Sequence, residues 1–138
     1  MRKSILFIDD EEGSVTPYFP MLHDLGVEVD LAHNGDEAVD WLQKKIYDLI
    51  VLDIMLPPGS KIGRDVEPRK AGSILLHMIR QNEVLNMKTA PSVAVVVLTA
   101  VADQKLLARI RQLGVKELFQ KPAVFDDVTE KLIALLKT

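Results

Sequence analysis

The chain has 138 residues, of which 48% are hydrophobic and 27% charged, and its formal net charge at pH 7 is -3. This size and composition predict one domain over residues 1–138, give no basic field for direct nucleic-acid binding, and leave no apolar run long enough to span a membrane. The absence of cysteine excludes disulfides, thiolate metal sites and a cysteine nucleophile, and it fits the reducing cytoplasm, which we expect as the location.

The first predicted strand leads into an acidic segment. Residues 5–8 are apolar and partly β-branched, and four consecutive acids follow them, which indicates a buried strand ending in an acidic loop. Thr16 and Pro17 have the pattern of a helix N-cap with proline at the first helical position, and Gly26 is typical of a helix end. We therefore expect a helix between Thr16 and Gly26.

The next stretch leads to one buried carboxylate. Residues 27–31 alternate as in a strand near a sheet edge, and residues 36–45 carry the apolar stripe of a helix. Residues 49–57 are almost wholly apolar, contain Asp53 and stop at a proline, which suits a strand buried on both faces of a parallel sheet. Asp53 is either a site residue, since such sheets bind ligands beyond the carboxyl ends of their strands, or a turn residue that ends the strand.

The remainder of the chain continues the alternation of strands and helices. Residues 57–70 hold three prolines and two glycines, which argues against regular structure and predicts a long loop. Five βα units in strict alternation predict an α/β fold, a doubly wound five-stranded parallel sheet with helices on both faces. Beyond the loop, the patterns predict helices over about 71–85, 103–113 and 125–136 and strands over 93–98 and 115–120.

Polar residues follow the carboxyl ends of the predicted strands: Asp9 and Asp10 after the first, Asp53 after the third, Thr99 after the fourth and Lys121 after the fifth. These ends converge in a doubly wound sheet, so the five residues should share one shallow cleft. Clustered carboxylates repel one another unless a cation offsets them, and Mg²⁺ suits aspartates without histidine or cysteine. A carboxylate facing a hydroxyl and an ammonium then matches phosphoryl transfer to the aspartate.

This combination resembles the receiver domain of the bacterial two-component response regulators, and the resemblance covers nearly the whole chain. It implies a flavodoxin-like sheet with strand order 2-1-3-4-5. The matching features are the acidic pair Asp9-Asp10, Asp53 with Pro57 four residues later, Thr99-Ala100 and Lys121-Pro122.

The resemblance implies a role for each residue of the cleft. Asp53 would be the phosphoacceptor, and Asp10, Asp53 and the backbone carbonyl of Met55 would bind Mg²⁺, with Asp9 acting through a water. Lys121 would pair with the phosphoryl group or with Asp53.

The resemblance also implies partners and a readout. The Thr99 hydroxyl would move towards the phosphate and report phosphorylation to the fourth major helix, and so to the surface that this helix forms with the fifth strand and the last helix. A sensor histidine kinase or phosphotransfer protein would donate the phosphate, and a downstream protein, an output domain or a second copy would bind the switched surface. The Lys121-Pro122 bond would be cis.

Two features depart from the family's pattern. Receivers of this type usually carry Tyr or Phe three residues before the site lysine, where this chain has Leu118. Phe119 should point to the other side of the sheet and cannot replace it. The loop over 57–70 is longer than usual by roughly ten residues and holds four basic against two acidic residues. It either overhangs the acidic pocket and tunes phosphorylation, or it is solvated and partly disordered.

Two other functions remain open. A Mg²⁺-dependent phosphohydrolase with an aspartate nucleophile would share the chemistry, but such enzymes carry a second Asp two residues later, where this chain has Met55. A pseudo-receiver, regulated by protein contacts without phosphorylation, gains weight from Leu118, whereas the complete set of acids, threonine and lysine argues against it.

Overall fold

In the computed structural model, which describes residues 2–137, five parallel strands form one sheet in the order β2-β1-β3-β4-β5. The predicted α/β fold and its strand order are therefore confirmed. The strands are β1 (Ser4–Ile8), β2 (Glu28–Ala32), β3 (Leu49–Leu52), β4 (Ala94–Thr99) and β5 (Glu117–Gln120). The helices are α1 (Glu12–Val15), the 3₁₀ turn η1 (Thr16–Tyr18), α2 (Phe19–Asp24), α3 (Gly35–Lys44), α4 (Gly59–Ile62), α5 (Pro68–Arg80), α6 (Gln104–Gln112) and α7 (Phe125–Leu136).

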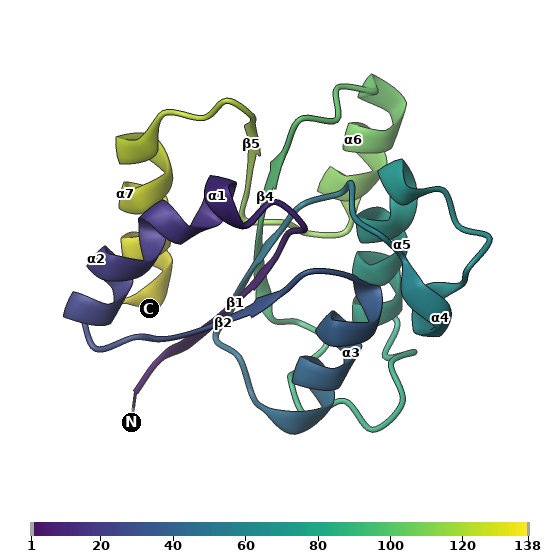
Figure 1. Ribbon diagram of the computed structural model, residues 1–138, viewed down its shortest axis with the longest axis horizontal. Coiled ribbons are helices and arrows are strands. Elements are labelled where there is room, and N and C mark those ends of the chain that lie inside the picture. The colour runs from purple at the N-terminus through teal and green to yellow at the C-terminus, as the bar shows by residue number, and fades with distance from the viewer. Residues whose placement is uncertain (1, 138) are drawn as a thin grey trace.

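Helices cover both faces of the sheet (Figure 1). On β1, Ile5 and Phe7 face the core under α1, α2 and α7, whereas Leu6 and Ile8 face the core under α3, α5 and α6. This alternation follows from the period-two geometry of a strand. All residues of β1 and β3 are buried, as expected for central strands of a parallel sheet covered on both sides.

The short strand β5 separates Leu118 from Phe119, as the sequence predicts. Leu118 packs against the core under α3, α5 and α6, and Phe119 packs against the opposite core. The Phe119 ring therefore cannot replace the aromatic side chain that position 118 lacks.

The prediction for the first helix is wrong at its start. Regular structure begins at Glu12 with Glu11 as the N-cap, and Thr16 opens the 3₁₀ turn rather than capping a helix. Gly26, with a φ of 77°, does lie in the turn after α2, as expected. The acidic segment after β1 is thus partly helical, which brings Ser14 back over the sheet edge.

The prediction of an irregular loop over 57–70 is wrong in part, since only residues 57–58 and 63–67 lie outside helices. The segment contains the helical turn α4, and α5 begins at Pro68 rather than at residue 71. The Asp36 carboxylate at the start of α3 accepts hydrogen bonds from the backbone N–H groups of Ser60 (3.2 Å) and Lys61 (2.9 Å). Lys61 also forms an ion pair with Asp40. These contacts, which we call the α3–α4 clamp, hold the inserted turn beside α3 (Figure 1).

Removing Asp36 should open the α3–α4 clamp. We expect Asp36→Ala to lower the free energy of unfolding by about 1–2 kcal/mol, because two backbone N–H groups lose an ionised acceptor. The hydrogen bonds, that to the Lys61 N–H foremost, lower the pKa of Asp36. A lowered folded-state pKa adds stability above the ordinary Asp range that is lost as the pH falls through the folded-state value.

Urea denaturation of the wild type and of Asp36→Ala between pH 7 and pH 3 measures this effect. The difference in stability should be largest near pH 7 and shrink at the acid end. Asp40→Ala is the matched control, since it breaks only an exposed ion pair worth less than about 1 kcal/mol. Equal losses in the two variants would contradict the role of the backbone hydrogen bonds.

Within residues 2–137, no helix combines the length and apolar character needed to cross a membrane.

Candidate functional site

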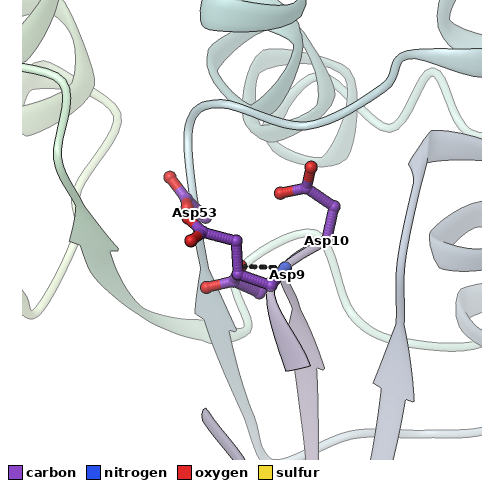
Figure 2. A group of neighbouring side chains, drawn as sticks. Asp9, Asp10 and Asp53 are labelled. Carbon is purple, nitrogen blue, oxygen red and sulfur yellow. Dashed lines mark hydrogen bonds between the residues drawn. The ribbon is translucent and has the colours of Figure 1, made fainter. Parts of the chain in front are cut away.

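Asp9 and Asp53 leave the sheet side by side. Ile8, the last residue of β1, pairs with Leu52, the last residue of β3. The pairing continues one step further, because the Asp53 N–H donates to the Ile8 carbonyl at 2.9 Å. Both carboxylates are buried, with exposed fractions of 2% for Asp9 and 4% for Asp53. Figure 2 shows them close together, with Asp10 rising beside them.

The Lys121 ammonium group joins the two buried carboxylates. Its Nζ lies 2.8 Å from Asp9 Oδ2 and 3.0 Å from Asp53 Oδ2. A third hydrogen bond, of 3.1 Å, goes to the Ser14 hydroxyl. An ammonium group has three N–H donors, so these three acceptors use all of them. The side chain is placed here by the turn after β5, where the Lys121-Pro122 peptide bond is cis, as the resemblance implied.

The second oxygen of Asp53 accepts hydrogen bonds from the other side of the site. The Thr99 hydroxyl donates to Oδ1 at 2.7 Å, and the Met55 N–H donates to the same oxygen at 3.0 Å. Thr99 Oγ1 in turn accepts a hydrogen bond from the Val101 N–H at 3.2 Å. Asp53 is therefore connected through one hydroxyl to the segment that leads into α6.

Burial makes the charges in this site costly. Desolvation raises the pKa of Asp9, although the hydrogen bond from Lys121 partly offsets it. For Lys121, desolvation lowers the pKa, but the hydrogen bonds to Asp9 and Asp53 outweigh it, so the pKa is raised. The lysine therefore stays charged at neutral pH, and the charged form of Asp9 depends on a cation close by.

The acidic residues can surround a cation. Each of Asp9, Asp10, Glu11 and Asp53 offers one carboxylate oxygen, and these oxygens lie within 4.8 Å of one another. Asp10 and Glu11 are exposed, which leaves room for the waters that a magnesium ion retains. An all-oxygen set of this kind fits a hard divalent cation and does not suit a soft metal.

The structure brings together the side chains of Asp9, Asp53, Thr99 and Lys121, with Asp10 at the open edge. For Met55, it places the backbone N–H against Asp53 while the side chain is 47% exposed.

Two residues beside Lys121 were missed from the sequence, Ser14 and the exposed Glu11. Ser14 Oγ lies 3.2 Å from Asp9 Oδ2 and accepts from Lys121, and Glu11 Oε1 lies 4.0 Å from Lys121 Nζ. A helix beginning at Glu12 would have been the signal, since it carries Ser14 over the strand ends.

A histidine connects the acidic segment to the neighbouring helix. His33 ring nitrogens contact the carboxylates of Glu37 and Glu12. The hydrogen bond to Glu37, followed by that to Glu12, raises the pKa of His33. The start of α1 is thereby tied to the start of α3.

Two residues show where parts of the 57–70 segment lie. Arg69 lines a hollow of about 160 Å³ with Met55 and Val101, whereas Lys61 of α4 faces Asp40 on α3. The helical turn α4 therefore lies beside α3.

Comparisons with known proteins agree with this geometry. The sequence profile of the response regulator receiver domain matches residues 5–133. The chain is 28% identical over 133 residues to hybrid signal transduction histidine kinase B of Dictyostelium discoideum, covering 95% of this chain and 6% of that protein. It spans between 6% and 44% of the length of the curated relatives it matches.

Two solved structures share the fold and part of the sequence. The non-phosphorylated HemR receiver domain from Leptospira biflexa superposes with a TM-score of 0.77 at 25% identity, over 99% of this chain and 96% of that one. A response regulator from Burkholderia pseudomallei, with a phosphorylated aspartic acid, a calcium ion and citrate, gives a TM-score of 0.66 at 26% identity, over 99% of this chain and 67% of that one. The chain therefore belongs to the response regulator receiver domain family of two-component signalling.

Proposed function

We propose that Asp53 accepts a phosphoryl group in a reaction that depends on Mg²⁺, and that a sensor histidine kinase or phosphotransfer protein donates it. The observation that carries this proposal is the placement of two donors on the two oxygens of Asp53. Lys121 Nζ lies 3.0 Å from Oδ2, and Thr99 Oγ1 lies 2.7 Å from Oδ1. The ammonium group and the hydroxyl on either oxygen are donors that could stabilise the negative charge that develops on the phosphoryl oxygens.

The chemistry uses the carboxylate as the nucleophile. An Asp53 oxygen would form a bond to phosphorus while the bond between phosphorus and the donor's imidazole nitrogen breaks, with its electron pair going to that nitrogen. Lys121 would exchange one of its present acceptors for a phosphoryl oxygen. Asp10, Asp53 and the Met55 carbonyl would hold Mg²⁺, with Asp9 acting through a water, and the bound ion would neutralise charge on the phosphoryl oxygens. The phosphorylated aspartic acid and calcium ion of the Burkholderia relative support this reading.

The hydrogen bonds beyond Asp53 suggest how phosphorylation is read. Thr99 would leave Asp53 for the phosphoryl group and carry the Val101 N–H with it, which shifts the start of α6. Gln120 Nε2 donates to the Val101 carbonyl at 2.7 Å, so β5 is coupled to the same segment. The surface of α6, β5 and α7 would then change its affinity for a downstream protein, an output domain or a second copy.

The test is phosphorylation of the full chain by acetyl phosphate in the presence of Mg²⁺. Intact mass should show a single added phosphoryl group in the wild type and none in Asp53→Asn, because an amide lacks the anionic nucleophile. Amide NMR with beryllofluoride should shift signals in α6 and β5 of the wild type only. No mass increase and no spectral change in the wild type would overturn the proposal and leave the pseudo-receiver reading.

The same experiment separates the phosphohydrolase reading. Steady turnover of an external phosphate ester that disappears in Asp53→Asn would favour an enzyme. The Met55 side chain offers no acid or base for such turnover, and it is half exposed beside the site.

A further inference from the structure

We infer that Ser14 is a positioning residue for Lys121: its hydroxyl keeps the ammonium group against Asp53, where phosphoryl transfer would take place. This inference rests on the proposed function, and none of the roles assigned above to the site residues includes Ser14. The residue lies in α1, and its hydroxyl accepts a hydrogen bond from the same ammonium group that contacts Asp53.

The geometry around Nζ carries the inference. Lys121 Nζ has acceptors at 2.8 Å on Asp9, 3.0 Å on Asp53 and 3.1 Å on Ser14. With three donors and three acceptors, the ammonium group has one orientation that satisfies all of its hydrogen bonds. Without the Ser14 hydroxyl, one N–H would lose its acceptor, because the next nearest carboxylate, that of Glu11, lies 4.0 Å from Nζ.

The hydroxyl of Ser14 is itself held in place. Its oxygen lies 3.0 Å from the Glu11 carbonyl and 3.2 Å from Asp9 Oδ2, so its proton has an acceptor while a lone pair faces Lys121. The Ser14 side chain is neutral, so it orients the ammonium group without adding to the negative charge of the site. A carboxylate in the same place would instead compete with Asp53 for the lysine.

The position of Ser14 also matters for the space beside the site. With Tyr18, Lys121 and Pro122, it lines a cavity of about 460 Å³ under the turn after β5. Lys121 would have room to move into this cavity when it loses its third acceptor. Holding the ammonium group away from the cavity is the physical effect that we assign to Ser14.

The test compares Ser14→Ala, Ser14→Thr and Ser73→Ala in the full chain. Ser73 is the matched control, because its hydroxyl also bonds the carbonyl three residues earlier, here that of Lys70 at 2.7 Å. With acetyl phosphate and Mg²⁺, Ser14→Ala should slow phosphorylation by about three- to tenfold. Ser14→Thr should stay within about twofold of the wild type, since it keeps the hydroxyl, and Ser73→Ala should have the wild-type rate.

A double-mutant cycle shows whether Ser14 acts through the lysine. In a Lys121→Met background, Ser14→Ala should cause no further slowing. A wild-type rate in Ser14→Ala, or the same fold loss with and without Lys121, would overturn the inference.

A measurement that does not use phosphorylation keeps the two proposals separate. The proton–nitrogen NMR signal of Lys121 Nζ should exchange faster with solvent in Ser14→Ala than in Ser73→Ala. If the wild type is not phosphorylated, the proposed function fails, and this exchange rate still decides whether Ser14 holds the ammonium group. Equal exchange in both variants would refute the positioning role.

Discussion

Replacing Lys121 with methionine should cost about 3 kcal/mol of folding free energy at pH 7, because it leaves two buried carboxylates without their cation. Asp9 and Asp53 are 2% and 4% exposed, so hydration offsets only part of the loss of the ammonium group. Phosphorylation by acetyl phosphate should also slow by about a hundredfold, as expected when one charged donor to the developing phosphoryl charge is lost.

The pH dependence of this variant has a defined sign. Without Lys121, desolvation and mutual repulsion raise the pKa of Asp9 further above its ordinary value. A carboxyl with a raised folded-state pKa makes the fold more stable as the pH falls through that pKa. In the wild type, Lys121 adds the same stability at every pH between 4 and 7, because it is fully charged below its ordinary pKa of 10.5 in both the folded and the unfolded state. The loss of stability of Lys121→Met relative to the wild type should therefore shrink as the pH falls from 7 to 4.

Denaturant titrations at several pH values, with and without Mg²⁺, measure both effects. Mg²⁺ should stabilise Lys121→Met more than the wild type, since binding to the folded state adds stability by mass action. Lys61→Met is the control, because Lys61 pairs with Asp40 at an exposed position worth less than about 1 kcal/mol. A variant of Lys121 as stable as this control would show that the buried carboxylates do not need the lysine.

Substituting Gly72 with alanine should destabilise the fold by about 3 kcal/mol. Helix α5 passes directly over the backbone of Asp53 and Ile54, and the Gly72 N–H donates to the Ile54 carbonyl at 2.8 Å. A Cβ on Gly72 would lie 2.4 Å from the Asp53 carbonyl oxygen and 2.6 Å from Ile54 Cα. Both are backbone atoms that cannot rotate away, so the helix or the strand end must shift.

Thermal or urea unfolding of Gly72→Ala measures the loss. Gly13→Ala is the matched control, since it is also a helical glycine and a Cβ there would meet nothing within 4 Å. In a helix, alanine is more favourable than glycine by up to about 1 kcal/mol, so Gly13→Ala should be as stable as the wild type or more stable. If Gly72→Ala were equally stable, the close approach of α5 to the Asp53 backbone would be wrong.

The fold and most of the site could be predicted because they depend on local patterns. Short apolar runs ending in polar residues located β1, β3 and β4, and period-two alternation located β2. Parallel pairing of the five strands then brings their carboxyl ends to one edge. Asp9, Asp53, Thr99 and Lys121 meet there for that reason alone. The expected separation of Leu118 and Phe119 also follows from the alternation along one strand.

The helical turn α4 escaped prediction because it depends on contacts between distant parts of the chain. The prolines and glycines of residues 57–70 indicate a loop, but α4 forms because Asp36, 24 residues before Ser60, accepts its backbone N–H groups. Gly59 makes the turn possible with a φ of 72°. Ser14 was missed for a local reason, since the helix pattern at Thr16 and Pro17 hid the earlier start of α1.

The α3–α4 clamp has a practical consequence for the exchange of segments between receivers. A Cβ on Gly35 would lie 2.0 Å from the Pro58 carbonyl oxygen, so the inserted turn needs glycine there as well as the acid at position 36. The insertion and the start of α3 thus form one transplantable unit made of two separate sequence segments. A chimera that moves only residues 57–66 into a short-loop receiver would carry the turn without the surface on which it folds.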